Sequence, residues 1–379
     1  MDRLTPRIRD YAWGSRTALA ELTGRPGPTD APEAELWMGA HEGDPSGLSR
    51  GREETTLDRI IEADPDGEIG ENTAVQFNRR LPFLLKVLAP EHALSIQVHP
   101  SSDDLLTAFH GTYADRWPKP EAWLAVTPFE VFAGSRPYAE VVALADLLGA
   151  QGFSALVQAA RSQSRPMHAL LSALLRLDAD RAGELVAQVC EAAARHTGDE
   201  TVAAMLRVAE DFPGDIGLIV LLTMRYRVMQ PGDYLFVPAG VMHAGVRGVV
   251  VEIQASSDSI VRAGLTSKRI DVAELLRIVD TDRSMVPERG SRDGRVVSFP
   301  VDVPYFQLHQ VLPGAEPVVV PGAHRPRIVL ALHGEVVLDD GADQLRLASG
   351  DSAFVPASQE RVTCSGDGTA YVATTGLAH

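Results

Sequence analysis

The chain has 379 residues, of which 45% are hydrophobic, and its formal net charge at pH 7 is −16. This length predicts about two or three domains, and this share of hydrophobic residues excludes a largely disordered chain. The acidic residues are spread along the chain, which argues against a surface for nucleic acid or anionic membranes. A local cluster of Lys and Arg can still bind an anionic small molecule.

The cysteine count and the start of the chain bear on where the protein works. Cys190 and Cys364 are too few for a disulfide framework or a thiolate metal site. The first residues lack the apolar stretch of a signal peptide, and no apolar run approaches the roughly 20 residues that span a bilayer. We therefore expect a cytoplasmic monomer with neither a nucleic-acid partner nor a membrane partner.

The pattern of apolar residues predicts strands, then helices, then strands again. Residues 81–88 are nearly all apolar, as in a strand covered on both faces, and residues 127–133 form a second strand that Gly134 should end. From about 138 to 224, apolar positions recur with helical spacing. Strand patterns return at 225–229 and 249–254 and continue through 300–379.

The segment Leu94-Ser-Ile-Gln-Val-His-Pro100 places three polar residues on alternate positions. Side chains alternate across a strand, so Ser95, Gln97 and His99 share one face while Ile96 and Val98 share the other. The apolar pair belongs in a core, and the polar face therefore looks into a cavity.

Two further residues complete a set of metal-binding groups. Glu121 follows Lys119-Pro120, and His243 ends a segment that begins at Pro231. With Gln97 and His99, they supply an amide oxygen, a carboxylate and two imidazoles, which suit a divalent metal such as zinc. The sequence offers no such partners for the remaining histidines, for which we expect structural or exposed positions: His41, His92, His110, His168, His196, His309, His324, His333 and His379.

One internal repeat indicates that a structural unit is used twice. Residues 232–239 read Gly-Asp-Tyr-Leu-Phe-Val-Pro-Ala, and residues 350–357 read Gly-Asp-Ser-Ala-Phe-Val-Pro-Ala. A turn, a short strand and a Pro that cannot continue the ladder make one hairpin unit. We expect two barrels of one type, and the second has Arg361 where the first has His243.

Several blocks together resemble one enzyme family, the type I mannose-6-phosphate isomerases (phosphomannose isomerases). They occur in family order from residue 11 to about residue 275. The blocks are Tyr11-Ala-Trp-Gly14, Ala34-Glu-Leu-Trp-Met-Gly-Ala-His41, Phe83-Leu-Leu-Lys86, 94–100, Lys119-Pro-Glu121, 231–243 and 258–268.

The resemblance implies a mainly β fold of two cupin (jelly-roll) β-barrels with a helical insertion. The expected division is a discontinuous catalytic cupin domain at 1–135 and 216–299, a helical domain at 136–215, and a metal-free cupin domain at 300–379. It also implies one Zn²⁺ per chain and the interconversion of mannose 6-phosphate and fructose 6-phosphate through a cis-enediol, in the supply of GDP-mannose. In the family pattern the zinc ligands correspond to Gln97, His99, Glu121 and His243.

A substrate phosphate is bound by cationic groups. Residues 262–268 could form a solvated loop, but the resemblance favours a role for them in the site. It places Arg262 at the reacting end of the sugar. We assign Lys86, Ser95 and Lys268 to substrate binding on the phosphate side.

Aldose–ketose isomerisation also requires a base and an electrophile. Glu252 lies opposite the apolar stripe Val249, Val251 and Ile253, and it is our candidate base. Lys119 is a candidate for ring opening or for fixing hydroxyls, and Trp13 for an aromatic wall against the sugar.

Two departures from the family pattern keep other functions open. The family usually has Asn-His before Lys-Pro-Glu, where this chain has Trp117-Pro118, and it commonly has Asn where this chain has Ser259. The first change leaves ring opening at that position in doubt and leaves room for a non-catalytic cupin that senses a sugar phosphate. An iron-dependent cupin oxygenase is disfavoured, because such sites usually have three histidines.

Overall fold

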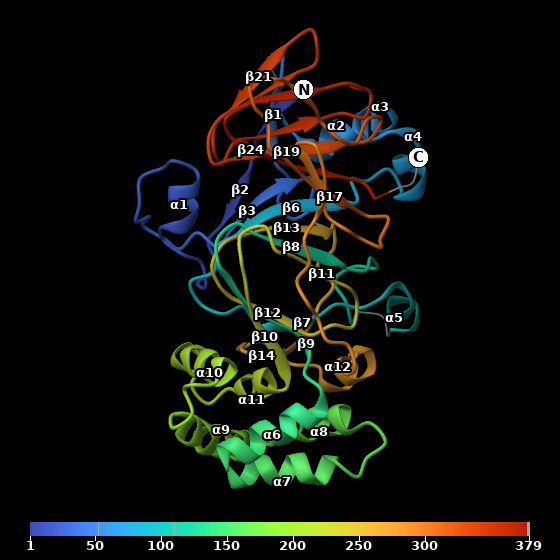
Figure 1. The fold of residues 1–379 in the computed structure, drawn as a ribbon. Helices are drawn as coiled ribbons and strands as arrows, with labels where there is room; N and C mark the ends of the chain where they lie inside the picture. The colour runs from blue at the N-terminus through green and yellow to red at the C-terminus, as the bar shows by residue number, and fades with distance from the viewer. Residues whose placement is uncertain (52, 109–110, 377–379) are drawn as a thin grey trace.

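The computed structural model describes residues 1–51, 53–108 and 111–376, so that His110 and His379 lie outside the described residues. Within these ranges the strands form four antiparallel sheets, stacked in layers along the length of the molecule with a helical layer at one end (Figure 1). No helix in these ranges is long and apolar enough to cross a membrane.

Two of the sheets face each other and enclose the candidate site; we call them the first sheet pair. The five-stranded sheet runs in the order β10 (Met224–Met229), β9 (Phe129–Ser135), β12 (His243–Arg247), β7 (Ile96–Val98) and β14 (Val261–Gly264). The six-stranded sheet runs in the order β11 (Tyr234–Val237), β8 (Glu121–Ala125), β13 (Val250–Ala255), β6 (Phe83–Leu88), β3 (Glu35–Gly39) and β2 (Arg7–Arg9).

The other two sheets form the second sheet pair. The nine-stranded sheet runs β15 (Ser291–Asp293), β16 (Val296–Ser298), β17 (Gln307–Val311), β24 (Thr369–Thr374), β19 (Arg327–Leu332), β22 (Ser352–Val355), β1 (Asp2–Thr5), β4 (Gly47–Arg50) and β5 (Glu53–Thr56). The four-stranded sheet runs β18 (Val318–Val319), β23 (Thr363–Gly366), β20 (Val336–Asp339) and β21 (Gln344–Leu347).

The predicted helical region is confirmed. It contains α6 (Tyr138–Leu148), α7 (Gln151–Ala160), α8 (Pro166–Leu175), α9 (Ala179–Ala193), α10 (Glu200–Asp211) and α11 (Gly217–Leu222). Shorter helices lie elsewhere: α1 (Ala18–Leu22), α2 (Leu57–Ala63), α3 (Pro65–Ile69), α4 (Glu71–Gln76), α5 (Ser102–Thr107) and α12 (Val272–Ile278).

The helical layer shares one core with the five-stranded sheet. Ile96 and Val98 of β7 and Phe132 of β9 are fully buried against helical residues such as Leu171 and Leu218. Burial of this apolar surface is what holds the helices on the sheet. The outward face of β7 is therefore fixed by the helices, and its other face turns toward the space between the sheets.

One predicted boundary is wrong, because Gly134 does not end its strand. β9 runs to Ser135, and Gly134 lies within it at a φ of +70°. A Cβ at this position would lie only 2.7 Å from the Arg283 backbone oxygen. Glycine is required here for close approach of the backbone, which lets the strand bend and continue.

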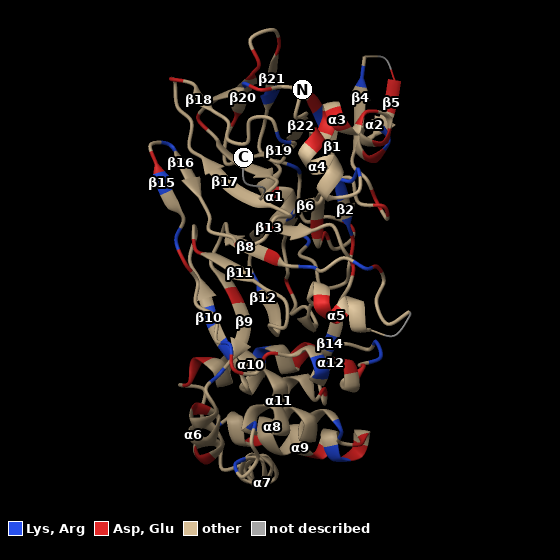
Figure 2. Ribbon diagram, turned by 90° about the vertical axis from the view of Figure 1, so that its right-hand side faces the viewer, with Lys and Arg blue, Asp and Glu red and all other residues tan. Residues whose placement is uncertain are grey.

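Charged residues of both signs are scattered over many elements of the fold (Figure 2). The acidic excess is thus distributed, as the sequence predicted.

We predict that Leu171→Ala lowers the free energy of unfolding by about 2–5 kcal/mol, because it leaves a cavity in the core that the helices share with β7. The same substitution at Leu147, whose side chain is 46% exposed, should cost less than about 1 kcal/mol. Urea denaturation of both variants checks this; equal losses would contradict the shared core.

Candidate metal centre and its cavity

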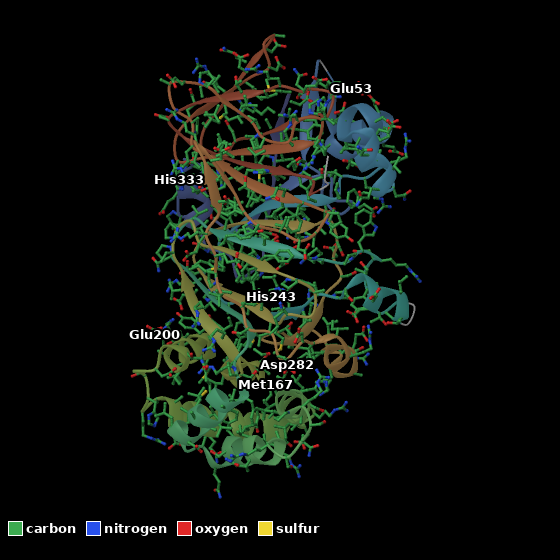
Figure 3. The ribbon with its side chains drawn as sticks, turned by 45° about the vertical axis from the view of Figure 1, so that its right-hand side comes forward. Glu53, Met167, Glu200, His243, Asp282 and His333 are labelled. Carbon is green, nitrogen blue, oxygen red and sulfur yellow. The ribbon has the colours of Figure 1, made fainter. Side chains whose placement is uncertain are left out.

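Three polar residues lie in one row across neighbouring strands of the five-stranded sheet. Gln97 of β7 is paired with His243 of β12 on one side and with Arg262 of β14 on the other. Residues opposite each other in antiparallel strands present their side chains to the same face. The row therefore faces the space inside the first sheet pair, and His243 lies in the middle of the molecule (Figure 3).

Glu121, at the start of β8, meets this row from the opposite sheet. Its Oε1 lies 3.0 Å from His243 Nε2, and its Oε2 lies 3.0 Å from His99 Nε2. One ligand atom from each of these residues lies within 4.8 Å of the others, and all three side chains are buried. The predicted carboxylate and both imidazoles thus converge, although about 120 residues separate Glu121 from His243 in the sequence.

The chemistry of these groups fits a metal ion. His243 Nδ1 lies 3.0 Å from the Val241 carbonyl oxygen, so Nδ1–H donates to it and Nε2 is left as a ligand. Within the described ranges, neither ring nitrogen of the fully buried His99 makes a hydrogen bond, despite the close Glu121 oxygen. Burial lowers the pKa of His99 to about 3, which keeps the ring in the neutral, metal-binding form.

Gln97 provides the fourth predicted ligand. Its Nε2 donates to Ser95 Oγ at 3.2 Å, so its amide oxygen is the atom left for a cation. Its register opposite His243 places the side chain on the correct face. Zinc bound by His, Gln and carboxylate groups would keep room for a substrate oxygen.

A second buried carboxylate lies close to the metal-binding groups. Glu252 of β13 accepts a hydrogen bond from Trp123 Nε1 at 3.0 Å, and its Oε1 lies 3.2 Å from Lys86 Nζ. Lys86 Nζ also lies 3.6 Å from Glu35 Oε2 and 4.8 Å from the centre of the Trp37 ring. The Lys86 side chain is only 7% exposed, so its ammonium group interacts with these two carboxylates and little with solvent.

The two carboxylates near the metal centre differ in their pKa values. Burial raises the pKa of Glu252 above its ordinary value, and the Lys86 charge only partly opposes this. Burial acts in the same direction on Glu121, but His99, His243 and Lys119 outweigh it and keep its pKa well below the ordinary value. Glu121 thus stays ionised, while Glu252 can take up a proton more readily.

A cavity of about 1040 Å³ lies beside these groups, and Gln97, Lys86 and Glu35 form part of its wall. Its lining includes all of the predicted substrate-binding residues and two predicted catalytic residues: Trp13, Lys86, Ser95, Lys119, Arg262 and Lys268. An inner recess of about 60 Å³, lined by Gln97, Glu121, His243 and Glu252 among others, shares several walls with it. Lys119 Nζ lies 3.5 Å from Glu121 Oε2. The large cavity thus leads to the metal-binding and acid–base groups.

Sequence reasoning missed several polar groups of this cavity. Glu35 contacts Lys86, and Trp123 contacts Glu252. Of these two missed residues, only Glu35 lies in a block that resembles the family. His41 and His92 were expected at structural or exposed positions, without a set of metal-binding partners. His41 Nε2 lies 3.3 Å from Asp258 Oδ2, and both residues line the cavity. His92 pairs with Asp211 at the cavity edge.

Comparison with known proteins agrees with this site. Residues 1–138 match the family model of the phosphomannose isomerase type I catalytic domain. The chain is 31% identical to mannose-6-phosphate isomerase of Escherichia coli K12 over 387 residues, which covers 97% of this chain and 98% of that protein. The chain belongs to the type I phosphomannose isomerase family.

Other relatives and solved structures extend the similarity. Mannose-6-phosphate isomerase of Homo sapiens is 31% identical over 371 residues, covering 88% of this chain and 86% of that protein. A zinc-bound crystal structure of mannose 6-phosphate isomerase matches with a TM-score of 0.90 at 30% identity, over 99% of each chain. A variant of phosphomannose isomerase from Salmonella typhimurium matches with a TM-score of 0.91 at 30% identity, over 100% of each chain.

We predict that Glu121→Gln weakens zinc binding by at least about 100-fold, since the change removes the only carboxylate of the ligand group. Metal content after dialysis, measured by atomic emission, checks this without any activity assay. Glu360→Gln removes a Glu whose side chain is 70% exposed and should leave the content at its starting value. Retention of zinc by the Glu121 variant would contradict the ligand assignment.

Proposed function

We propose that this chain is a zinc-dependent isomerase that interconverts mannose 6-phosphate and fructose 6-phosphate. The observation that carries the proposal is the pairing of a convergent His–Glu–His group with a second buried carboxylate of raised pKa, Glu252, in one cavity. Membership of the family over nearly the whole chain supports the same reaction. The cofactor is zinc.

In this proposal, Gln97, His99, Glu121 and His243 hold the zinc. When bound there, zinc polarises a substrate oxygen as a Lewis acid. Burial lowers the pKa of His99 and keeps its ring neutral for this role, and His243 is buried beside it between the sheets. Their rings lie 4.7 Å apart at an angle of 45°.

Glu252 is the proposed base that moves the proton between C1 and C2 of the open-chain sugar through a cis-enediol. Its raised pKa brings it nearer to the operating pH, which favours reversible proton transfer. Trp123 donates to one of its oxygens and holds the carboxylate in place. Lys86, expected on the phosphate side, is instead placed beside this base, because Glu35 and Glu252 both bind its ammonium group.

The remaining cavity residues are assigned by position. Arg262 lies opposite Gln97 in the sheet, so we place its guanidinium at the reacting end of the sugar, where it stabilises the negative charge of the enediol. Lys119, beside Glu121, fixes substrate hydroxyls. Lys268 is exposed at the cavity edge and, with Ser95, receives the phosphate, while Trp13 forms a wall against the sugar.

We also propose that the two sheet pairs are two cupin barrels and that helices α6–α11 are an insertion into the first. The proposed division remains 1–135 with 216–299, then 136–215, and 300–379. Strands β1, β4 and β5 from the N-terminal region and β15 and β16 from the 216–299 segment extend the nine-stranded sheet, so hydrogen bonds cross these boundaries. We propose a monomer that works in the cytoplasm.

We predict that Glu252→Gln lowers kcat by about 10²–10⁴-fold, because the amide cannot accept the proton. Trp123→Phe should keep the base and lose its hydrogen bond, with a loss of about tenfold. A coupled assay on mannose 6-phosphate measures both. Turnover of the Glu252 variant within a few-fold of the unmodified enzyme would show that another group is the base.

The pH dependence follows from the direction of the Glu252 shift. The base acts when ionised, so kcat/KM should fall as the pH drops through a pKa that lies above about 4.3, the ordinary value for Glu. The Glu252→Gln variant should lose this acidic limb. A limb that persists unchanged in the variant would assign it to a different group.

Chelation tests the reaction as a whole. Turnover of mannose 6-phosphate should disappear after chelation and return when zinc is added, since the electrophile is then restored. Chelator-insensitive turnover would overturn the zinc mechanism. Zinc binding and sugar-phosphate binding without any turnover would favour the sensor instead.

A further inference from the structure

The two sheet pairs repeat the same strand order, so positions in one have counterparts in the other. The order β2-β3-β6-β13-β8-β11 in the first pair matches β15-β16-β17-β24-β19-β22 in the second. The sequence repeat fixes the register, because Val237 and Val355 occupy the same place in it. Val237 pairs with Glu121, whereas Val355 pairs with Arg327. Arg327 therefore stands where the first pair has its metal-binding carboxylate.

The other two carboxylates of the first site are also replaced. Glu252 pairs with the residue two positions after Glu121, and Val372 pairs with the residue two positions after Arg327, so Val372 is the counterpart of Glu252. Following the strand pairs onward in the same register, through β6 to β3 and through β17 to β16, makes Val296 the counterpart of Glu35. Three carboxylates thus become two valines and one arginine. The interior of the second sheet pair has the opposite sign of charge at these positions.

Arg327 lacks compensation for its charge among the described residues. The residue is 0% exposed, and its Nη2 donates to the backbone oxygens of Pro356 and Gln359. Its Nε and Nη1 have no hydrogen-bond partner in the described chain. A buried ion without a counter-ion is costly, and carbonyl groups supply only partial charge. The guanidinium stays protonated near neutral pH, although burial lowers its pKa to about 10.

Further buried donors without partners among the described residues lie at the same end of the sheet as Arg327. Thr374 follows Ala373, the residue of β24 that pairs with Ile328, the neighbour of Arg327. Its Oγ1 is buried with no hydrogen-bond partner in the ranges that the structure describes, as is that of Thr375. The Gly322 backbone passes close to both side chains: a Cβ there would lie 2.9 Å from Thr374 Oγ1 and 3.2 Å from Arg327 Cγ. Arg325 Nη1 donates to the Thr375 carbonyl oxygen at 3.0 Å, which brings a second cation to the same end of the sheet.

We propose that the second sheet pair binds a small oxyanion, of the phosphate or sulfate kind, at Arg327 and Thr374. The Nε and Nη1 groups of Arg327 and the Thr374 hydroxyl would donate to its oxygens, as charge-assisted hydrogen bonds. The anion would supply the missing counter-charge, in the place where the first sheet pair uses carboxylates to hold a cation. This inference does not depend on the isomerase reaction.

Equilibrium dialysis of the full chain against radiolabelled sulfate tests the site. The unmodified protein should bind one equivalent that Arg327→Met loses, because the methionine cannot donate. Arg361→Met is the matched control, since it removes an exposed positive charge from the same sheet pair, and it should retain that equivalent. Equal binding by the Arg327 variant and the unmodified protein would overturn the proposal.

A second variant keeps the test valid if Arg327→Met does not fold. Thr374→Val preserves shape and should weaken the same equivalent by about tenfold through the lost hydrogen bond; an unchanged affinity would overturn the proposal. Competition identifies the source of the anion. Displacement of this equivalent by inorganic phosphate alone indicates a free anion, and displacement by fructose 6-phosphate as well indicates a phosphate monoester.

Discussion

The register of β7 is the constraint on which the site depends. This strand is only three residues long, and it carries the helical core on one face and the polar row on the other. A slip of one residue would exchange the two faces, and Ile96 and Val98 would then point into the cavity. Burial of these two side chains beneath the helices therefore keeps Gln97 opposite His243 and Arg262. The helical layer thus helps to position the candidate site by packing against β7.

The second requirement is that neighbouring carboxylates behave differently. Glu121 and Glu252 belong to adjacent strands, and both are almost fully buried. Two imidazoles and Lys119 surround the first, so its charge is favoured despite burial. The second has one ammonium group, which it shares with Glu35, and burial dominates. Such a separation of pKa values suits one carboxylate for holding a metal and the other for carrying a proton.

Local patterns were sufficient to predict much of this from the sequence. Alternation identified the polar face of β7, helical spacing identified a helical region from about 138 to 224, and repeated residues identified the matching strands β11 and β22. Contacts that depend on the pairing of distant strands were not predictable in this way. Glu35 reaches Lys86 because β3 pairs with β6, and His41 reaches Asp258 across more than 200 residues of sequence. The strand was predicted to end before Gly134 because the close approach of the Arg283 backbone, which requires a glycine there, lies far along the chain.

The two sheet pairs show how little of a site the backbone determines. Both have the same strand order and the same pairing next to the repeated segment, yet the position of Glu121 in one is that of Arg327 in the other. Each buried charge requires a partner of opposite sign. A group of carboxylates and imidazoles selects a cation, and an isolated guanidinium beside hydroxyl groups selects an anion. Similarity of fold therefore shows which positions correspond, whereas the side chain at each position decides which ion can bind there.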